Sequence, residues 1–216
     1  MKDDELIIHI KEDKAVKLEI VEKGTVRTKN ISPQALFEAI KGSIKEDAVS
    51  TGILPSNIIA LKIGQNAKYA VVEYPYETAD ITYIKTEYKD FPLPRLLFGF
   101  TIENSGRISQ VNLGVPAPGK LTPETQMFFY PFSNVRGFHM CTGANTLPYI
   151  NDLQLLKNMP DYILSLPDND DYFETSHNQQ KMSRRDLMEH LTDKNRQYYY
   201  DNILIPMPGT TLKNFL

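Results

Sequence analysis

Apolar residues recur at every second position in short segments of the first two thirds of the chain. Residues 6–10 are almost wholly apolar, and in residues 16–21 Val16, Leu18 and Ile20 alternate with charged side chains. A period of two is typical of strands with one buried face. Residues 11–15 are enough for a hairpin link, so this part of the sequence predicts a strand pair.

Further along the chain, five more segments have the composition of strands: residues 57–63, 68–74, 95–102, 107–113 and 126–130. The links Gly64–Ala67 and Glu103–Gly106 contain the Gly, Asn and Ser residues that favour tight turns. The pattern therefore predicts a meander of antiparallel strands. The Pro- and Gly-rich residues 115–123 are expected to form an exposed loop.

A helix is predicted between the first strand pair and this meander. Ser32 is a suitable N-cap, Pro33 suits the first turn, and apolar residues follow at helical spacing until near Lys45. The pattern divides the chain into an N-terminal extension of strands and one helix, a main domain and a tail expected to fray: residues 1–54, 55–205 and 206–216.

Helical spacing dominates after Pro148. Pro148 and Pro160 each suit the first turn of a short helix, and Ser183 begins a Ser-x-x-Asp capping box ahead of another. Strands followed by helices predict an α+β fold, with helices stacked on one face or end of an antiparallel sheet.

Composition narrows the classes of function. The 216 residues include 24 Lys and Arg against 27 Asp and Glu, a net charge of −3, which gives no basic excess for binding nucleic acid. No apolar run approaches the roughly 18 residues of a membrane span, and the first residues are acidic where a signal peptide is basic. We therefore expect a cytoplasmic protein that binds neither nucleic acid nor a membrane.

The single cysteine is the candidate for chemistry. One thiol excludes an intrachain disulfide and any zinc-finger or Cys-x-x-Cys site. An isolated cysteine is usually a small buried apolar residue, but Cys141 follows a stretch in which Pro131, Asn134 and Gly137 indicate irregular backbone. If the chain doubles back through Gly137, the Asn134 carboxamide approaches the thiol. A nucleophile beside a neutral donor is suited to acyl transfer.

These residues resemble a known family. Pro131-x-x-Asn134-Val135, Gly137 and His139-Met140-Cys141 are similar to the active site of ubiquitin-conjugating enzymes (the UBC fold), in which His-Pro-Asn precedes Gly-x-Ile-Cys-Leu. The closer likeness is to the bacterial branch called prokaryotic family D, which includes the PRTRC system B proteins. It extends from about Pro94 to His177 and includes four further matches: Leu96-Leu97-Phe98, Tyr130-Pro131-Phe132-x-Asn134-Val135, Cys141-x-Gly143 and Phe173-x-x-Ser176-His177.

The resemblance implies a function as well as a fold. Cys141 matches the thiol that accepts the C-terminal glycine of a ubiquitin-like protein from an activating enzyme of the ThiF type, and Asn134 matches the asparagine that supports the oxyanion or the loop. A protein amine would be the acceptor. The family's chemistry needs no metal or organic cofactor, because the activating enzyme consumes the ATP. Two departures concern the histidine of His-Pro-Asn, replaced by Phe132-Ser133, and the family's usual N-terminal helix, replaced by strands and a different helix.

Two histidines are candidate assistants of the thiol. In an extended segment His139 projects to the same side as Cys141, where it either tunes the thiol or is simply solvated. His177 lies in a segment that the resemblance includes, and we favour a role in pinning its loop over one at the thiol. The acidic residues 168–171 form either a solvated loop or a proton acceptor for an incoming amine.

Three other functions remain open. A cysteine hydrolase would combine Cys141 with His177 and an Asn or Asp, and needs a histidine held on the thiol. A metal site would use His139, Cys141 and His177, although His-x-Cys is a weak signal. A non-catalytic module of the same fold would bind a ubiquitin-like protein without forming a thioester.

Overall fold

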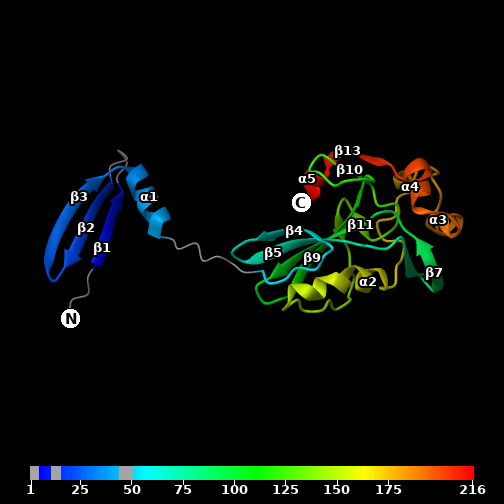
Figure 1. Ribbon diagram of the computed structural model, residues 1–216, viewed down its shortest axis with the longest axis horizontal. Helices are drawn as coiled ribbons and strands as arrows, with labels where there is room; N and C mark the ends of the chain where they lie inside the picture. Colours follow the sequence, from blue (N-terminus) through cyan, green and yellow to red (C-terminus); the bar gives the residue numbers. More distant parts are fainter. Residues whose placement is uncertain (1–4, 11–15, 44–50) are drawn as a thin grey trace. The chain divides into compact units, whose positions relative to one another are not determined.

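The computed structural model describes residues 5–10, 16–43 and 51–216, and it divides into two compact units. The units are Met1–Ser50 and Thr51–Leu216, whereas the sequence pattern places the boundary after residue 54. Figure 1 shows both, and they are described separately below.

The first unit is a three-stranded antiparallel sheet followed by a helix. Strands β1 (Glu5–Ile10), β2 (Val16–Glu22) and β3 (Thr25–Ile31) lie in that order, and α1 spans Pro33–Ser43. The predicted strand pair is confirmed. Strand β3 was not predicted, because residues 25–30 are mostly polar. The predicted N-cap is also confirmed, since Ser32 Oγ accepts a hydrogen bond from the Ala35 N–H at 3.1 Å. The predicted link 11–15 and helix end near Lys45 lie outside the described residues.

The second unit contains the predicted meander. Its main sheet has the order β11-β12-β9-β8-β5-β4, and every neighbouring pair is antiparallel. The two long hairpins, β4–β5 and β8–β9, match the predicted segments closely. The six strands are β4 (Ile58–Ile63), β5 (Ala67–Glu73), β8 (Leu97–Glu103), β9 (Ile108–Pro116), β11 (Val135–Arg136) and β12 (His139–Met140).

A separate hairpin interrupts the meander between β5 and β8. Strands β6 (Thr78–Tyr83) and β7 (Thr86–Pro92) pair with each other in their own two-stranded sheet. The sequence pattern did not predict them, because β7 is rich in charged residues. Only a few of their side chains, among them Ile81, Tyr83 and Phe91, enter the core.

The C-terminal third contains short helices, as predicted, but the helix expected to open at Pro148 begins only at Leu153, where Asp152 is the N-cap. Helix α3 begins after Ser183, whose Oγ accepts from the Asp186 N–H, which confirms the predicted cap. In Figure 1, α3 and α4 lie at one end of the sheet, near β7, while α2 lies on the side away from β10 and β13. The segments are the 3₁₀ helices η1 (Leu153–Asn158) and η2 (Thr175–His177), and the α-helices α2 (Met159–Leu164), α3 (Arg184–Leu191) and α4 (Arg196–Asn202).

The core of the second unit joins the sheet to these helices. Phe98 and Phe100 on β8 are fully buried, as are Leu187 on α3 and Tyr199 on α4. Burying an apolar side chain of this size stabilises a fold by about 1.5–3 kcal/mol. The mixed α and β architecture with antiparallel sheets and C-terminal helices is therefore confirmed.

The prediction that residues 206–216 fray was wrong. Strand β13 (Pro206–Thr211) pairs with β10 (Gln126–Phe128), and α5 (Leu212–Phe215) buries its apolar side chains. Pro206, Pro208 and Gly209 suggested an irregular tail, but prolines are tolerated in a strand that pairs along one edge only. The register shift in the β10–β13 ladder is consistent with such a strand.

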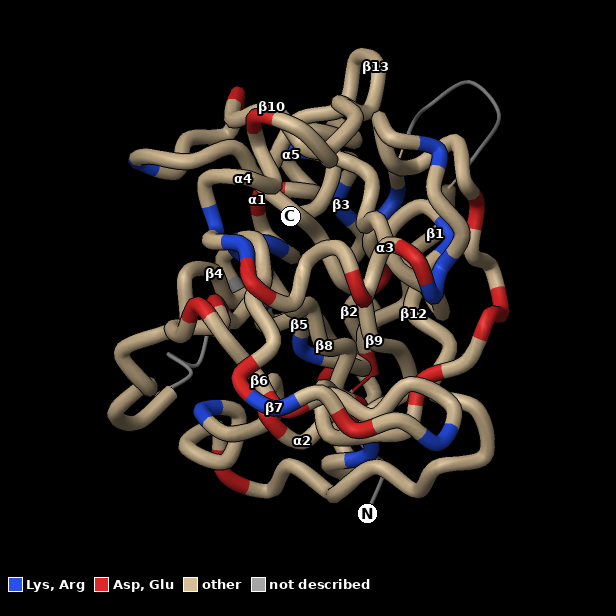
Figure 2. The backbone as a smooth tube through the Cα atoms, turned by 90° about the vertical axis from the view of Figure 1, so that its right-hand side faces the viewer, with Lys and Arg blue, Asp and Glu red and all other residues tan. Residues whose placement is uncertain are grey.

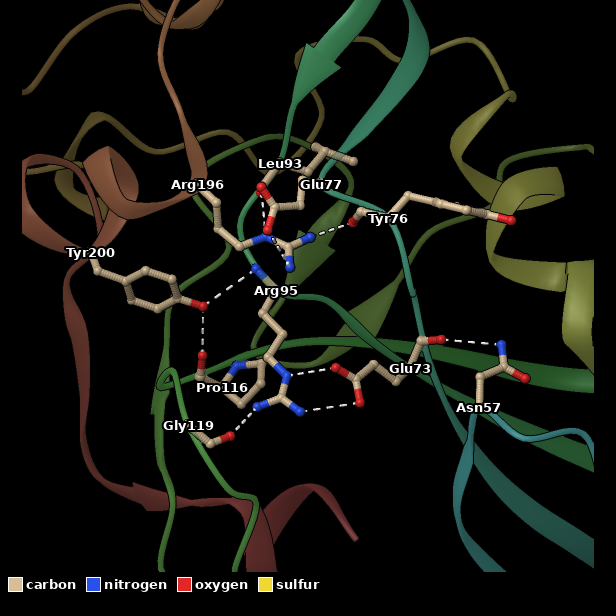
Figure 3. Close-up of polar contacts among 10 residues, drawn as sticks. All are labelled: Asn57, Glu73, Tyr76, Glu77, Leu93, Arg95, Pro116, Gly119, Arg196 and Tyr200. Atoms are coloured by element: carbon tan, nitrogen blue, oxygen red, sulfur yellow. Dashed lines mark hydrogen bonds and ion pairs between the residues drawn. The ribbon is translucent and has the colours of Figure 1, made fainter.

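A polar cluster ties the loop after β9 to the sheet (Figure 3). The Arg95 guanidinium donates to both carboxylate oxygens of Glu73, at 2.7 and 3.1 Å, and to the Gly119 carbonyl at 2.5 Å. Tyr200 of α4 donates to the Pro116 carbonyl at 2.9 Å. The predicted exposed loop 115–123 therefore begins later than expected, because Val115 and Pro116 are the buried end of β9, and Arg95 holds it at Gly119.

Two features concern the expectations about membranes and about charge. None of the helices in the described parts of the chain is long and apolar enough to cross a membrane. Figure 2 shows Lys and Arg interspersed with Asp and Glu along the backbone.

Candidate functional site

A two-residue hairpin delivers Cys141 to the edge of the sheet. Strands β11 and β12 pair through Val135–Met140 and Arg136–His139, and Gly137 lies in their turn with a φ of 62°. Strand β12 in turn pairs with Val111 and Asn112 of β9. The predicted reversal of the chain through Gly137 is confirmed, and Cys141 directly follows the paired strand.

The reversal brings the main chains of Cys141 and Asn134 together. The Cys141 N–H donates to the Asn134 carbonyl oxygen at 2.8 Å, and the Asn134 N–H donates to the Asp171 carbonyl at 2.6 Å. Asn134 has a φ of 62°, in the left-handed region that asparagine enters more readily than most residues. The asparagine therefore serves the backbone of this loop as well as carrying a carboxamide.

Both residues line one cavity of about 150 Å³. Cys141 is half-buried there, and the loop that carries Asp168 and Asp171 also lines this cavity. The residues that line this cavity all lie within the described range 51–216, and none of them is Lys, Arg or His. Arg184, which does not line the cavity, is ion-paired with Asp168, so Asp171 is the carboxylate of the wall that favours a neutral or cationic ligand group over an anion.

The Asn134 side chain is held by Asp168. Its Nδ2 donates to Asp168 Oδ1 at 2.5 Å, and the same oxygen accepts from the Asn169 N–H at 2.9 Å. Main-chain bonds of 2.8 Å from Asp168 to Thr82 and from Ile84 to Asp168 attach this loop to the β6–β7 hairpin. Burial raises the pKa of Asp168, and the neighbouring Arg184 opposes the rise.

Arg184 is a residue of the site that the sequence pattern did not identify. It is the first residue of α3, its side chain is 3% exposed, and it donates to Ser133 and to Asp168. The sequence placed it only within a capping box. Nothing in local spacing indicates that this arginine, and not the exposed Arg185 beside it, points inward.

His139 lies near Cys141 on β12, and it is exposed. His139 and Cys141 both line a second hollow of about 250 Å³, which runs along β9 beside Ser109 and Gln110. The expectation that the two side chains share one side of the segment agrees with this arrangement. The structure therefore brings Cys141, Asn134 and His139 together.

His177 is engaged elsewhere. Its ring stacks on Phe129 with centroids 4.3 Å apart, and its Nε2 lies 3.5 Å from a Glu174 carboxylate oxygen. His177 is not one of the residues that line the two hollows beside Cys141 in the described range 51–216. This geometry agrees with the pinning role. The described residues contain no group of three His, Cys, Asp or Glu side chains arranged to hold a metal ion.

Comparison of this chain with family models, with curated proteins and with solved structures finds no match. The likeness to ubiquitin-conjugating enzymes therefore rests on the motif around Asn134 and Cys141.

Proposed function

We propose that this protein carries a ubiquitin-like protein as a thioester on Cys141 and transfers it to an amine of a protein target. The observation that carries the proposal is the joint placement of Cys141 and Asn134, which are hydrogen-bonded through their main chains and both line one cavity. A thiol nucleophile and a carboxamide donor are the groups that acyl transfer requires.

In the loading step the Cys141 thiolate attacks the thioester carbonyl that joins the modifier's C-terminal glycine to a cysteine of the activating enzyme. The new C–S bond forms as the old one breaks, and the activating enzyme's sulfur leaves as a thiolate. Asp168 engages one N–H of the Asn134 carboxamide, so the other can donate to the tetrahedral oxyanion.

In the transfer step a neutral amine attacks the Cys141 thioester. The C–N bond forms, the C–S bond breaks, the thiolate leaves, and the amine's proton passes to a base. Both oxygens of Asp168 are engaged by Asn134, Asn169 and Arg184, so Asp171 is the carboxylate of the wall that suits an ammonium group and can take up the proton. ATP and a ThiF-type activating enzyme are required upstream, and no metal or organic cofactor enters either step.

The position of the histidines favours transfer over hydrolysis. A cysteine hydrolase needs an imidazole held on its thiol, whereas His177 stacks on Phe129 and His139 is exposed. An incoming thioester is already activated, so transfer does not need a paired base.

The test is to combine the purified protein with ATP and with the activating enzyme and ubiquitin-like protein encoded beside its gene. Gels run with and without thiol reductant should show a reductant-sensitive adduct that Cys141→Ala abolishes and Cys141→Ser converts to a reductant-resistant ester. If the modifier binds but forms no adduct, the protein is a non-catalytic binding module; if neither occurs, the proposal is wrong.

A further inference from the structure

Arg184 is buried, although arginine side chains in proteins are mostly exposed. Its side chain is 3% exposed, and a buried guanidinium is costly unless it is paired. Its Nε donates to Ser133 Oγ at 2.8 Å, and another guanidinium nitrogen donates to Asp168 Oδ2. The guanidinium carbon lies 4.5 Å from the Phe132 ring centroid and 4.8 Å from that of Tyr83. The fork is therefore fixed in one orientation.

Arg184 donates hydrogen bonds to two groups, and each of them is connected to Asn134. Ser133 precedes it in the chain and is itself fully buried, while Asp168 accepts the hydrogen bond from its carboxamide. The first residue of α3 is thus linked both to the backbone entering Asn134 and to its side chain.

The charge of Arg184 determines which way the carboxamide faces. An ionised carboxylate only accepts hydrogen bonds, so Asn134 must turn its NH₂ group towards Asp168. Three titratable or charged groups face Asp168. They are Arg184 on α3, Asp170 in the same loop as Asp168, and Tyr130 in the segment after β10. Of these groups only the arginine is a cation. Without it a buried carboxylate takes up a proton more readily, and the protonated acid can donate to the carboxamide oxygen instead.

We propose that Arg184 is a positioning residue for the transfer reaction: through Ser133 and Asp168 it fixes the Asn134 carboxamide so that its second N–H remains available beside Cys141. This inference rests on the proposed function, but the contacts that carry it are independent of the modifier's identity.

The test compares discharge of preloaded Cys141 thioester to free lysine in the wild type, Arg184→Lys, Arg184→Gln and the control Arg185→Gln. Arg185 is the exposed neighbour on the same helix. We expect discharge to fall about 10- to 100-fold in Arg184→Gln and less in Arg184→Lys, which keeps the charge but not the fork. The ratio of the Arg184→Gln rate to the wild-type rate should rise with pH as Asp168 ionises, and that of Arg185→Gln should stay near one.

A second measurement covers variants that fold poorly. In the wild-type protein the Asn134 side-chain NH₂ signals, assigned by their loss in Asn134→Gly, should show one proton shifted downfield by the carboxylate. This shift should persist in Arg184→Lys, which keeps the charge, and decrease in Arg184→Gln. Wild-type protein that forms no thioester would refute the proposed function alone. A wild-type spectrum without the downfield shift, or Arg184→Gln discharge rates that equal the wild-type rates at every pH, would overturn the positioning role.

Discussion

The main-chain N–H of Cys141 donates a 2.8 Å hydrogen bond to the carbonyl oxygen of Asn134. This bond closes the segment that contains the β11–β12 hairpin, and it uses no side-chain atom of either residue. The relation between the two positions therefore survives replacement of either side chain. Substitutions at Asn134 can separate the chemical role of the carboxamide from the folding of the loop.

We expect Asn134→Gly to keep the fold and lose transfer. Glycine adopts the observed φ of 62° without steric cost, so the loop should form, whereas the donor to the oxyanion is gone. Single-turnover discharge should fall about 100-fold, the usual effect of removing one such donor. Asn134→Ala should show the same loss of rate and a further loss of about 1 kcal/mol in the free energy of unfolding, because alanine is strained at positive φ.

Urea unfolding separates the two variants, and thiol alkylation reports whether Cys141 keeps its surroundings. A wild-type discharge rate in Asn134→Gly would show that the carboxamide takes no part in transfer.

The main sheet could be predicted from the sequence because its strands carry their own pattern. Residues 57–63 and 107–113 are bounded by turn residues and alternate or run apolar, and both appear as strands close to these bounds. The polar β3 and the charged β7 were missed, since pairing partners stabilise such strands more than their own composition does. The C-terminal strand was missed because its prolines and glycine dominate the local signal.

The candidate site was predictable only along the chain. Cys141, Asn134 and His139 lie within eight residues, so turn chemistry alone suggested that they meet. Arg184 and Asp168 reach the site through tertiary packing across long separations, which no local spacing encodes. His177 was a candidate by resemblance, and its stacking on Phe129 depends on the fold.

The hydrogen bond between Tyr83 and Asp170 should be a measurable part of the stability of the loop opposite Cys141. Tyr83 Oη donates to Asp170 Oδ1 at 2.7 Å, so Tyr83→Phe should lower the free energy of unfolding by about 1.5–3 kcal/mol. Chemical denaturation at neutral pH checks this value.

The same pair predicts a pH dependence. Burial, and next the Asp170 carboxylate, raise the pKa of Tyr83 to about 12. The folded-state pKa thus exceeds the usual value of 10, so this contribution is complete below pH 10 and is lost as the pH rises through about 12. The stability difference between wild type and Tyr83→Phe should be constant up to pH 10 and shrink above it. A difference that stays constant up to pH 12 contradicts this assignment.

The Arg95–Glu73 ion pair should contribute more to the free energy of unfolding than an exposed pair of the same chemistry. The Arg95 and Glu73 side chains are 18% and 27% exposed, and the guanidinium also holds the Gly119 carbonyl. Arg95→Lys should cost about 1–2 kcal/mol of unfolding free energy, because lysine cannot replace the bidentate fork. Arg107, whose side chain is 60% exposed in its pair with Glu103, is the control, and Arg107→Lys should change stability by less than about 0.5 kcal/mol. Equal effects of the two substitutions would contradict the role given to burial.

The last helix should stabilise the hairpin that carries Cys141. Phe215 of α5 is 3% exposed, and its ring meets that of Phe138, in the turn between β11 and β12, edge-on at 5.0 Å. Gly114 of β9 packs closely here, since a Cβ there would lie 2.9 Å from the Phe215 ring and 2.7 Å from the Met127 methyl group. Phe215→Ala should therefore lower the free energy of unfolding by about 3 kcal/mol.

Gly114→Ala should push the helix away and give a loss in the same direction, since packing of this density leaves no room for a methyl group. Both variants should also speed alkylation of Cys141 in the folded state, because the hairpin leading to the thiol loses its support. The control is Ile53→Ala, whose side chain is 86% exposed and whose effect should stay within about 0.5 kcal/mol. A destabilised Phe215→Ala protein with an unchanged alkylation rate would show that α5 supports the sheet but not the site.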